Sequence, residues 1–413
     1  MEIRPILSTL MRHKTAAALI VLEIALTCAI ICNALFMIGA RITQLREVSG
    51  LAENELVRIQ ITGIGSDANA EAQTRSDLAM LRGLPGVTGA TVLNQVPFVN
   101  SSWNSSINLQ QDQQQPTANA TVYMAEEKFV QTLGLKLVAG RDFNPDEFLE
   151  FEALQQSEGP DRPAGVPAAL ITRTLAERLF PGEDAVGKTF YSWGDAPIRV
   201  VGVLEHLVRP SMQGGPSQRE YSMVFPIRTH YNVGGNYVVR TSPERRDEVL
   251  NAASDALRAN GANRIILEDN TKSVEQLRSE FYQEARSMAW LLGIVCIALL
   301  LITALGIVGL ASFWVQQRTK QIGVRRALGA TRGQILRYFQ TENFLLATIG
   351  IVLGMLLAYA INQILMGKYE LPRLPLYYLP VGALALWLLG QVAVFGPARR
   401  AAAVPPAIAT RSV

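Results

Sequence analysis

Four long apolar runs dominate the pattern of hydrophobic and polar positions along the chain. One lies near the start and three fall in the last third, with a long polar stretch between them, and Glu23 is the only charged residue inside the first run. Each exceeds the roughly 20 residues that a helix needs to cross a bilayer. The pattern predicts four transmembrane helices in a one-plus-three arrangement around a water-soluble domain. The predicted spans are residues 15–40, 286–316, 342–367 and 376–398.

Basic residues predict the orientation of these helices, because cytoplasmic loops retain Lys and Arg. They concentrate in an amphipathic N-terminal tip at residues 1–14, in the loop 317–341 and in the tail 399–413. We therefore expect both termini in the cytoplasm, and the domain 41–285 and the short loop 368–375 on the outer side. The first run is longer than a signal-peptide core and lacks a small-residue cleavage site before the first charges, so we expect an uncleaved helix.

The polar stretch has the alternating pattern of an α+β domain. Four segments alternate like strands and two have helical periodicity; the strands are 55–62, 87–98, 236–240 and 264–268, and the helices 69–82 and 243–260. Two βαβ units separated in sequence predict one split α+β domain with an inserted lobe at about residues 139–221. The predicted fold class is an α-helical membrane protein with four transmembrane helices plus this ectodomain.

Two stalk helices are expected to connect the ectodomain to the membrane. Apolar residues recur at helical spacing from Val274 to Met288, and Ile42 to Val48 extend the first span outward. The residues chosen as stalk contacts are Leu45, Val274, Leu277 and Phe281. Direct continuity with membrane spans favours mechanical linkage over ordinary surface helices.

Composition excludes several classes of function. The net charge of +3 is too small to indicate a nucleic-acid partner. The three cysteines all lie in apolar runs, so the ectodomain has no disulfide, and three scattered histidines do not give a zinc-ligand spacing. Serine-nucleophile motifs are also missing. We therefore predict no catalytic, cofactor-binding or metal-binding residues in this chain.

One motif imitates a nucleotide site. Residues 182–189 (GEDAVGKT) match G-x-x-x-x-G-K-[ST], the phosphate-binding P-loop. A P-loop follows a buried strand and opens a helix, whereas here a helical segment comes before and a strand pattern after. Glu183 and Asp184 would also repel a triphosphate. We therefore interpret this match as accidental and predict no nucleotide-binding site here.

The cytosolic loop carries the most distinctive pattern. Residues 316–335 (QQRTKQIGVRRALGATRGQI), followed by Glu342, resemble the signature of the FtsX-like permease family, the membrane subunits of MacB-type ABC transporters. The resemblance extends over the whole chain, including residues 140–143 (GRDF), the segment 179–188 and the tail segment 397–402 (PARRAA). The family usually has Glu at the position of Gln321. The resemblance implies that the 182–189 motif belongs to the ectodomain.

The resemblance further implies a permease in the bacterial inner membrane that is not an enzyme by itself. A dimer of separate cytosolic ATPase chains would use ATP and Mg, and a second permease, identical or paralogous, would pair with this one, often with a periplasmic adaptor and an outer-membrane duct. Closure of the ATPase would move the ectodomain through the stalk and extrude cargo of the peptide, drug or lipoprotein class. The residues implied to contact the ATPase are Ile322, Arg325, Arg326, Ala327, Leu328, Gly329 and Ala330.

Alternatives remain at this stage. The same mechanics could regulate a periplasmic cell-wall hydrolase, and a lone anchored adhesin or sensor is a third interpretation. For the loop, a basic segment that only sets topology competes with ATPase contact. Glu23 is the intramembrane polar residue to explain, because an acid inside a span is costly. A helix–helix contact is favoured over a transport role for it.

Overall fold

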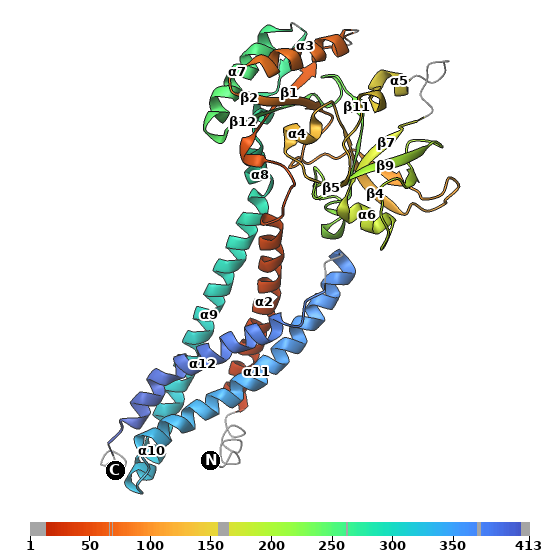
Figure 1. Ribbon diagram of the computed structural model, residues 1–413. Coiled ribbons are helices and arrows are strands. Elements are labelled where there is room, and N and C mark those ends of the chain that lie inside the picture. Colours follow the sequence, from red (N-terminus) through yellow and green to blue (C-terminus); the bar gives the residue numbers. More distant parts are fainter. Residues whose placement is uncertain are drawn as a thin grey trace. The chain divides into compact units, whose positions relative to one another are not determined.

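The computed structural model describes residues 14–65, 67, 69–155, 165–261, 263–369 and 373–405 (Figure 1). The chain divides into two compact units. The helical unit comprises Met1–Arg46 and Glu284–Val413, and the α/β unit comprises Glu47–Gln283. The predicted N-terminal tip and the end of the tail lie outside the described residues.

Four helices in the described part of the chain are long and apolar enough to cross a membrane, as the apolar runs predict. They are α2 (Lys14–Leu45), α9 (Gln283–Gln317), α11 (Arg332–Tyr369) and α12 (Tyr378–Ala402). A shorter helix, α10 (Thr319–Ala327), lies between α9 and α11 in sequence. The buried core of the helical unit is shared by α2, α9, α11 and α12.

Close packing of α2 against α11 depends on two glycines spaced four residues apart. A Cβ atom added to Gly350 would lie 2.8 Å from the Cβ of Ile24, and one added to Gly354 would lie 2.5 Å from the Cβ of Cys28. Small-xxx-small spacing lets two helix backbones approach where apolar burial alone gives no driving force between helices. Asn33 adds a hydrogen bond from its Nδ2 to the carbonyl of Ala358 at 3.2 Å.

The first sheet of the α/β unit has the strand order β13-β1-β12-β2, with β14 paired to β1. The strands are β1 (Leu56–Gly63), β2 (Val87–Leu93), β12 (Asn236–Thr241), β13 (Arg264–Ile266) and β14 (Lys272–Ser273). Because β12 runs antiparallel to both β1 and β2, it fills the gap between two strands joined through helix α3 (Ala70–Gly83). Helix α7 (Arg246–Ala259) joins β12 to β13 and packs beside α3 (Figure 1).

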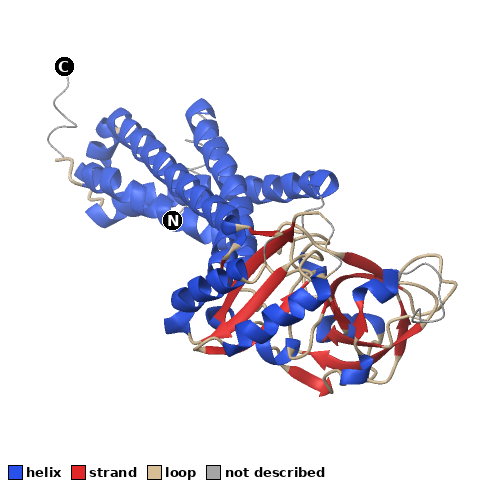
Figure 2. Ribbon diagram, turned by 90° about the horizontal axis from the view of Figure 1, so that it is seen from above, coloured by secondary structure: helices blue, strands red, loops and turns tan. Residues whose placement is uncertain are grey.

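The second sheet has the order β3-β4-β10-β7-β9-β5, with β8 paired to β9. Figure 2 shows the strands of the α/β unit in red. Its strands are β3 (Asn104–Ile107), β4 (Ala118–Met124), β5 (Leu137–Gly140), β7 (Ala168–Thr172), β8 (Thr189–Tyr191), β9 (Pro197–Leu204) and β10 (Ser222–Phe225). Short elements complete the unit: α4 (Phe129–Leu133), β6 (Leu149–Glu150), α5 (Phe151–Gln155), α6 (Arg173–Leu179), β11 (Ile227–Arg228) and α8 (Val274–Phe281). The second lobe thus runs from about residue 104 to 225, and the predicted start at 139 is wrong.

Two further boundaries differ from the sequence-based prediction. The strand predicted over 87–98 ends at Leu93, because the following Asn94 and Gln95 turn their amides toward the backbone of β4. The helix predicted to run unbroken from Val274 to Met288 is interrupted at Tyr282, between α8 and α9. The first helix ends at Leu45, so Val48 lies outside it.

A buried carboxyl next to β4 gives the α/β unit a pH dependence. Burial, followed by the adjacent Glu127, raises the pKa of Glu126 to about 8. The folded state therefore holds this proton more tightly than the unfolded chain, and stability decreases as the pH rises from about 5 to 8, by at most about 1.4 kcal/mol per pH unit. We expect Glu126→Gln to flatten this slope in denaturant titrations at several pH values. An unchanged slope would contradict the assignment.

Candidate functional site

Helix α10 is mounted on the ends of α11 and α12 through one buried face. Ile322, from the middle of α10, is buried with Ile335 and Phe339 of α11 and with Ala398 and Ala401 of α12. The small alanines of α12 allow the short helix to lie close to it. The loop predicted to contact an ATPase is therefore an ordered helix with a defined inner face.

Polar contacts fix the same helix at its two ends. Arg318, just before α10, forms an ion pair with Glu342 of α11, with Nη1–Oε distances of 3.0 and 2.9 Å. The two side chains are only 8% and 2% exposed. At the other end, Arg326 donates from Nη1 to the carbonyl of Ala402 at 2.7 Å, and Arg325 lies over the ring of Tyr338.

Gly329 terminates α10 in a Schellman motif. The N–H of Ala330 donates to the carbonyl of Arg325 at 3.0 Å, and the N–H of Gly329 donates to that of Arg326 at 3.2 Å. Gly329 has a φ of +97°, which favours glycine. A Cβ added there would meet no atom within 4 Å. Within this chain, the backbone conformation at position 329 is therefore what favours glycine.

The outer face of α10 is apolar at two positions one turn apart. Val324 is 51% exposed and Leu328 is 83% exposed, and Ala327 between them is exposed as well. Residues i and i+4 lie on one side of a helix, so these side chains form one surface, which we call the α10 face. The residues predicted to contact the ATPase include Leu328 but not Val324. The spacing of four residues between the two could have indicated Val324 as well.

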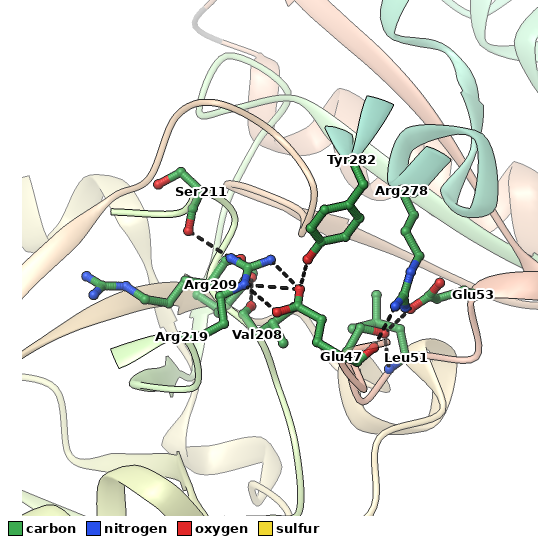
Figure 3. Close-up of polar contacts among 11 residues, drawn as sticks. Glu47, Leu51, Glu53, Val208, Arg209, Ser211, Arg219, Arg278 and Tyr282 are labelled. Carbon is green, nitrogen blue, oxygen red and sulfur yellow. Dashed lines mark hydrogen bonds and ion pairs between the residues drawn. The ribbon is translucent and has the colours of Figure 1, made fainter. Parts of the chain in front are cut away.

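Glu47 organises a buried polar cluster in the α/β unit, directly after the chain leaves α2 (Figure 3). Its carboxylate accepts hydrogen bonds from Arg219 at 2.8 to 3.1 Å and another from the hydroxyl of Tyr282. Arg219 also donates from Nη1 to the carbonyls of Arg209 and of Ser211. One carboxylate thus joins three segments: the chain after α2, the 207–219 loop of the second lobe, and the residue before α9. We call this set the Glu47 cluster.

Electrostatics within the Glu47 cluster favour the charged pair. Burial alone would lower the pKa of Arg219, but its hydrogen bonds to Glu47 and the charge of that carboxylate raise the pKa instead. Burial is the main cause that raises the pKa of the Tyr282 phenol, and the hydrogen bond to Glu47 raises it further. The phenol therefore keeps its proton and donates it to the carboxylate in a hydrogen bond. Beside this cluster, Arg278 donates to Glu53 at 2.5 Å and to the carbonyl of Glu47 at 2.6 Å.

Three of the residues predicted as stalk contacts belong to the α/β unit. Val274 and Leu277 of α8 are buried in it. The ring of Phe281 lies 5.9 Å from that of Phe98 and 5.5 Å from the guanidinium of Arg219. Leu45 is the last residue of α2. Helix α8 is therefore an element of the α/β fold, and the chain reaches α9 through the break at Tyr282.

Glu23 lies against α9 inside the helical unit. A Cβ added to Gly306 would sit 2.6 Å from its carboxylate oxygens. One turn further along α2, the hydroxyls of Thr27 and Thr303 are hydrogen-bonded at 2.9 Å. Glu23 therefore lies beside Gly306 of α9, and its role as a helix–helix contact stays a prediction.

The P-loop lookalike has the wrong structural context, as predicted. Helix α6 comes before it and strand β8 after it, the reverse of the order that binds phosphates. Lys188 is held by Glu183 and lies 5.2 Å from the ring centre of Phe180. Among the residues that the structure describes, no group of three or more His, Cys, Asp or Glu could hold a metal ion.

Comparison with protein families now adds to this geometry. Residues 18–259, more than half of the chain, match the MacB-like periplasmic core domain, and residues 293–406 match the FtsX-like permease C-terminal model. The chain belongs to this permease family. The resemblance inferred from the cytosolic loop is thereby confirmed, and the α/β unit is the periplasmic core domain of an FtsX-like permease.

Two relatives found by sequence similarity agree with this assignment. The permease is 24% identical to the uncharacterized ABC transporter permease YknZ of Bacillus subtilis (strain 168), over 84% of this chain and 82% of that one. It is 25% identical to the macrolide export ATP-binding/permease protein MacB of Acinetobacter baylyi, over 90% of this chain and 53% of that protein. It thus spans about half the length of the MacB relative. The crystal structure of the extracellular domain of a YknZ transporter from Gram-positive bacteria matches 51% of this chain and all of that one, with 18% identity and a TM-score of 0.31.

Proposed function

We propose that this permease is the membrane subunit of an ABC transporter that passes ATP-driven motion from a separate cytosolic ATPase to its periplasmic core domain. ATP and Mg would be bound by a dimer of ATPase chains, and a second permease, identical or paralogous, would complete the assembly. Both termini and α10 would face the cytoplasm, as the basic segments suggest. The name of the MacB relative joins ATP binding and permease in one protein. The YknZ relative, of which this chain spans 82%, is named a permease alone, and this name supports a separate ATPase.

The observation that carries the proposal is the α10 face. Leu328 is 83% exposed, although α10, which ends at the preceding residue, is anchored by its buried face. Apolar anchors on a rigid element suit a partner's pocket, where a few buried side chains supply most of the binding energy. Anchoring by Ile322 and Arg326 would carry a displacement of α10 into α11 and α12.

The Glu47 cluster supports the outer half of the same path. It ties both ends of the α/β unit, where the chain leaves α2 and where it enters α9, to the loop of the second lobe. A change in the spacing of the two helix ends would therefore act on the whole core domain. The work done would be extrusion of cargo of the peptide, drug or lipoprotein class, with an adaptor and an outer-membrane duct where the envelope has one. No specific feature of the described residues favours regulation of a cell-wall hydrolase.

The test of this proposal replaces Leu328 with Asp. Leu328 is exposed, so the fold should tolerate the change, whereas a charge in an apolar interface should weaken ATPase binding by more than about tenfold. Full-length permease is purified from native membranes, and the co-purifying ATPase chain and its ATP hydrolysis are measured. Leu328→Met is the matched control, because it keeps an apolar side chain of similar size. Undiminished co-purification and hydrolysis with Leu328→Asp would reject the proposed role of the α10 face.

A further inference from the structure

An open cavity of about 430 Å³, lined mostly by polar residues, lies in the α/β unit between its two lobes. Strand β1 and the start of β12 form one side, and the segment 94–103 that leads from the first sheet to the second forms another. The volume is within the range of small-molecule sites. The cavity is separate from the α10 face and from the Glu47 cluster, and its argument does not depend on the proposed coupling.

Arg58 of β1 lines this cavity and is unusual among the buried arginines. The residue is 4% exposed. Its guanidinium donates from Nε to Asn236 Oδ1 at 2.8 Å and from Nη2 to Gln60 Oε1 at 2.6 Å. Its Nη1 group makes no hydrogen bond to any residue that the structure describes. Neutral amide oxygens therefore orient the cation without neutralising it.

Three other arginines with buried side chains have carboxylate partners in the described chain. Arg219 is paired with Glu47, Arg264 with Asp77, and Arg318 with Glu342. Arg209 also lacks a carboxylate, but the carboxamides of Asn104, Asn119 and Gln218 surround its guanidinium, and it does not line the cavity. Among these arginines, Arg58 is the one that lines this cavity.

The charge of Arg58 is present at neutral pH and is costly to leave unbalanced. Burial lowers the pKa of its guanidinium to about 10, so the group remains protonated at pH 7. A buried charge is normally compensated by an opposite charge. Among the described residues that line the cavity there is no Asp or Glu. The compensating anion would therefore come from a ligand.

The walls combine fixed and available polar groups. Asn94 and Gln95 are occupied by hydrogen bonds to the carbonyl of Val122 in β4, which fixes this side of the cavity. Asn100, Ser101 and Asn270 also line it, and their side chains make no hydrogen bond within the described structure. The indole of Trp103, 42% exposed, supplies apolar surface beside them.

We propose that this cavity binds a carboxylate, with the guanidinium of Arg58 as its charged anchor. Arginine presents parallel N–H donors that match the two oxygens of a carboxylate. One buried cation among neutral amides balances one negative charge, which fits a carboxylate better than a phosphate dianion. Trp103 would contact the apolar part of the ligand. A free carboxylic acid and the C-terminus of a peptide share this chemistry.

The test uses the full-length permease in detergent and two tripeptides, N-acetyl-Ala-Ala-Ala with a free carboxylate and the same peptide with a C-terminal amide. Binding is followed by tryptophan fluorescence, and Trp103→Phe identifies the signal from the cavity. The free acid should bind at least about tenfold more tightly than the amide, because only it forms a charge-assisted hydrogen bond with Arg58. Acetate is titrated in the same way. Binding of acetate without binding of the free-acid tripeptide would identify a free carboxylic acid as the ligand. Tight binding of the free-acid tripeptide would identify a peptide C-terminus.

Arg58→Gln should weaken binding of the preferred carboxylate by at least about tenfold. Arg240→Gln is the matched control, because it removes a cation from the same sheet that is already paired with Glu55 and does not line the cavity. Thermal unfolding shows whether the Arg58→Gln variant is folded. If it is not, Arg58→Lys is used instead, because it keeps the positive charge but loses the paired N–H donors of the guanidinium. Equal affinity for acid and amide, no binding of either carboxylate at millimolar concentration, or tighter binding of inorganic phosphate would overturn the proposal.

Discussion

Replacing Glu47 with Ala is expected to destabilise the α/β unit by about 3 kcal/mol, because it leaves Arg219 buried without its charge partner. The exposed fractions of the Arg219 and Glu47 side chains are only 7% and 15%. The hydroxyl of Tyr282 loses its acceptor as well. The 207–219 loop should then separate from the segment that follows α2, and hydrogen exchange in that loop should accelerate.

The matched control for Glu47 is Glu248→Ala. Its pair with Arg245 lies on an exposed helix surface, so the loss should be within about 0.5 kcal/mol. The double variant Glu47→Met with Arg219→Met removes both charges and should recover much of the stability, since an apolar pair of similar volume needs no compensation. Denaturant unfolding of the full-length permease, with hydrogen exchange to locate the change, measures all variants. Equal losses of unfolding free energy for Glu47→Ala and Glu248→Ala would show that the buried pair of Glu47 and Arg219 does not stabilise the α/β unit.

Replacing Glu342 with Gln is expected to release α10 from its mounting. Arg318 would keep its charge in a site where it is 8% exposed, at a cost of about 3 kcal/mol. Because Arg318 precedes the first turn of α10, the strain should act there, and the segment 318–331 should become sensitive to protease. ATP hydrolysis by the co-purified ATPase should lose its dependence on the permease.

Two variants distinguish this effect from a general loss of charge. Arg337→Gln removes an exposed cation from α11 and should change neither protease sensitivity nor hydrolysis. Arg318→Met combined with Glu342→Met should restore protease resistance, because no buried charge is left unpaired. If Glu342→Gln leaves the segment 318–331 as resistant as the unmodified protein does, the ion pair is dispensable for holding α10.

Much of the helical unit is predictable because length and apolarity determine each helix separately. The run expected at 286–316 became α9 at Gln283–Gln317, and the run at 15–40 became α2 at Lys14–Leu45. In the α/β unit, the segment predicted at 55–62 became β1 at Leu56–Gly63, where inward apolar residues alternate with polar ones. Such local patterns need no knowledge of distant contacts.

The second lobe and the candidate sites depend on contacts that local patterns do not contain. Strand β3 (Asn104–Ile107) consists mostly of small polar residues, so its pairing with β4 gives no apolar signal. Glu47 and Arg219 are 172 residues apart, and nothing in either neighbourhood indicates the other. Gln276 reads as an ordinary exposed helix residue, yet it forms a capping box with Ser273 that starts α8.

The packing of α2 against Gly350 and Gly354 bears on how the protein is made. The contact between Asn33 and Ala358 joins residues 325 positions apart, so at ordinary rates of synthesis α2 waits on the order of half a minute for its main partner. In that interval the ribosome completes the whole α/β unit, residues 47–283. Until α11 is inserted, the surface of α2 that receives the two glycines must be covered by lipid or by an insertion factor. Assembly of the helical unit, which holds the N-terminus, therefore finishes last.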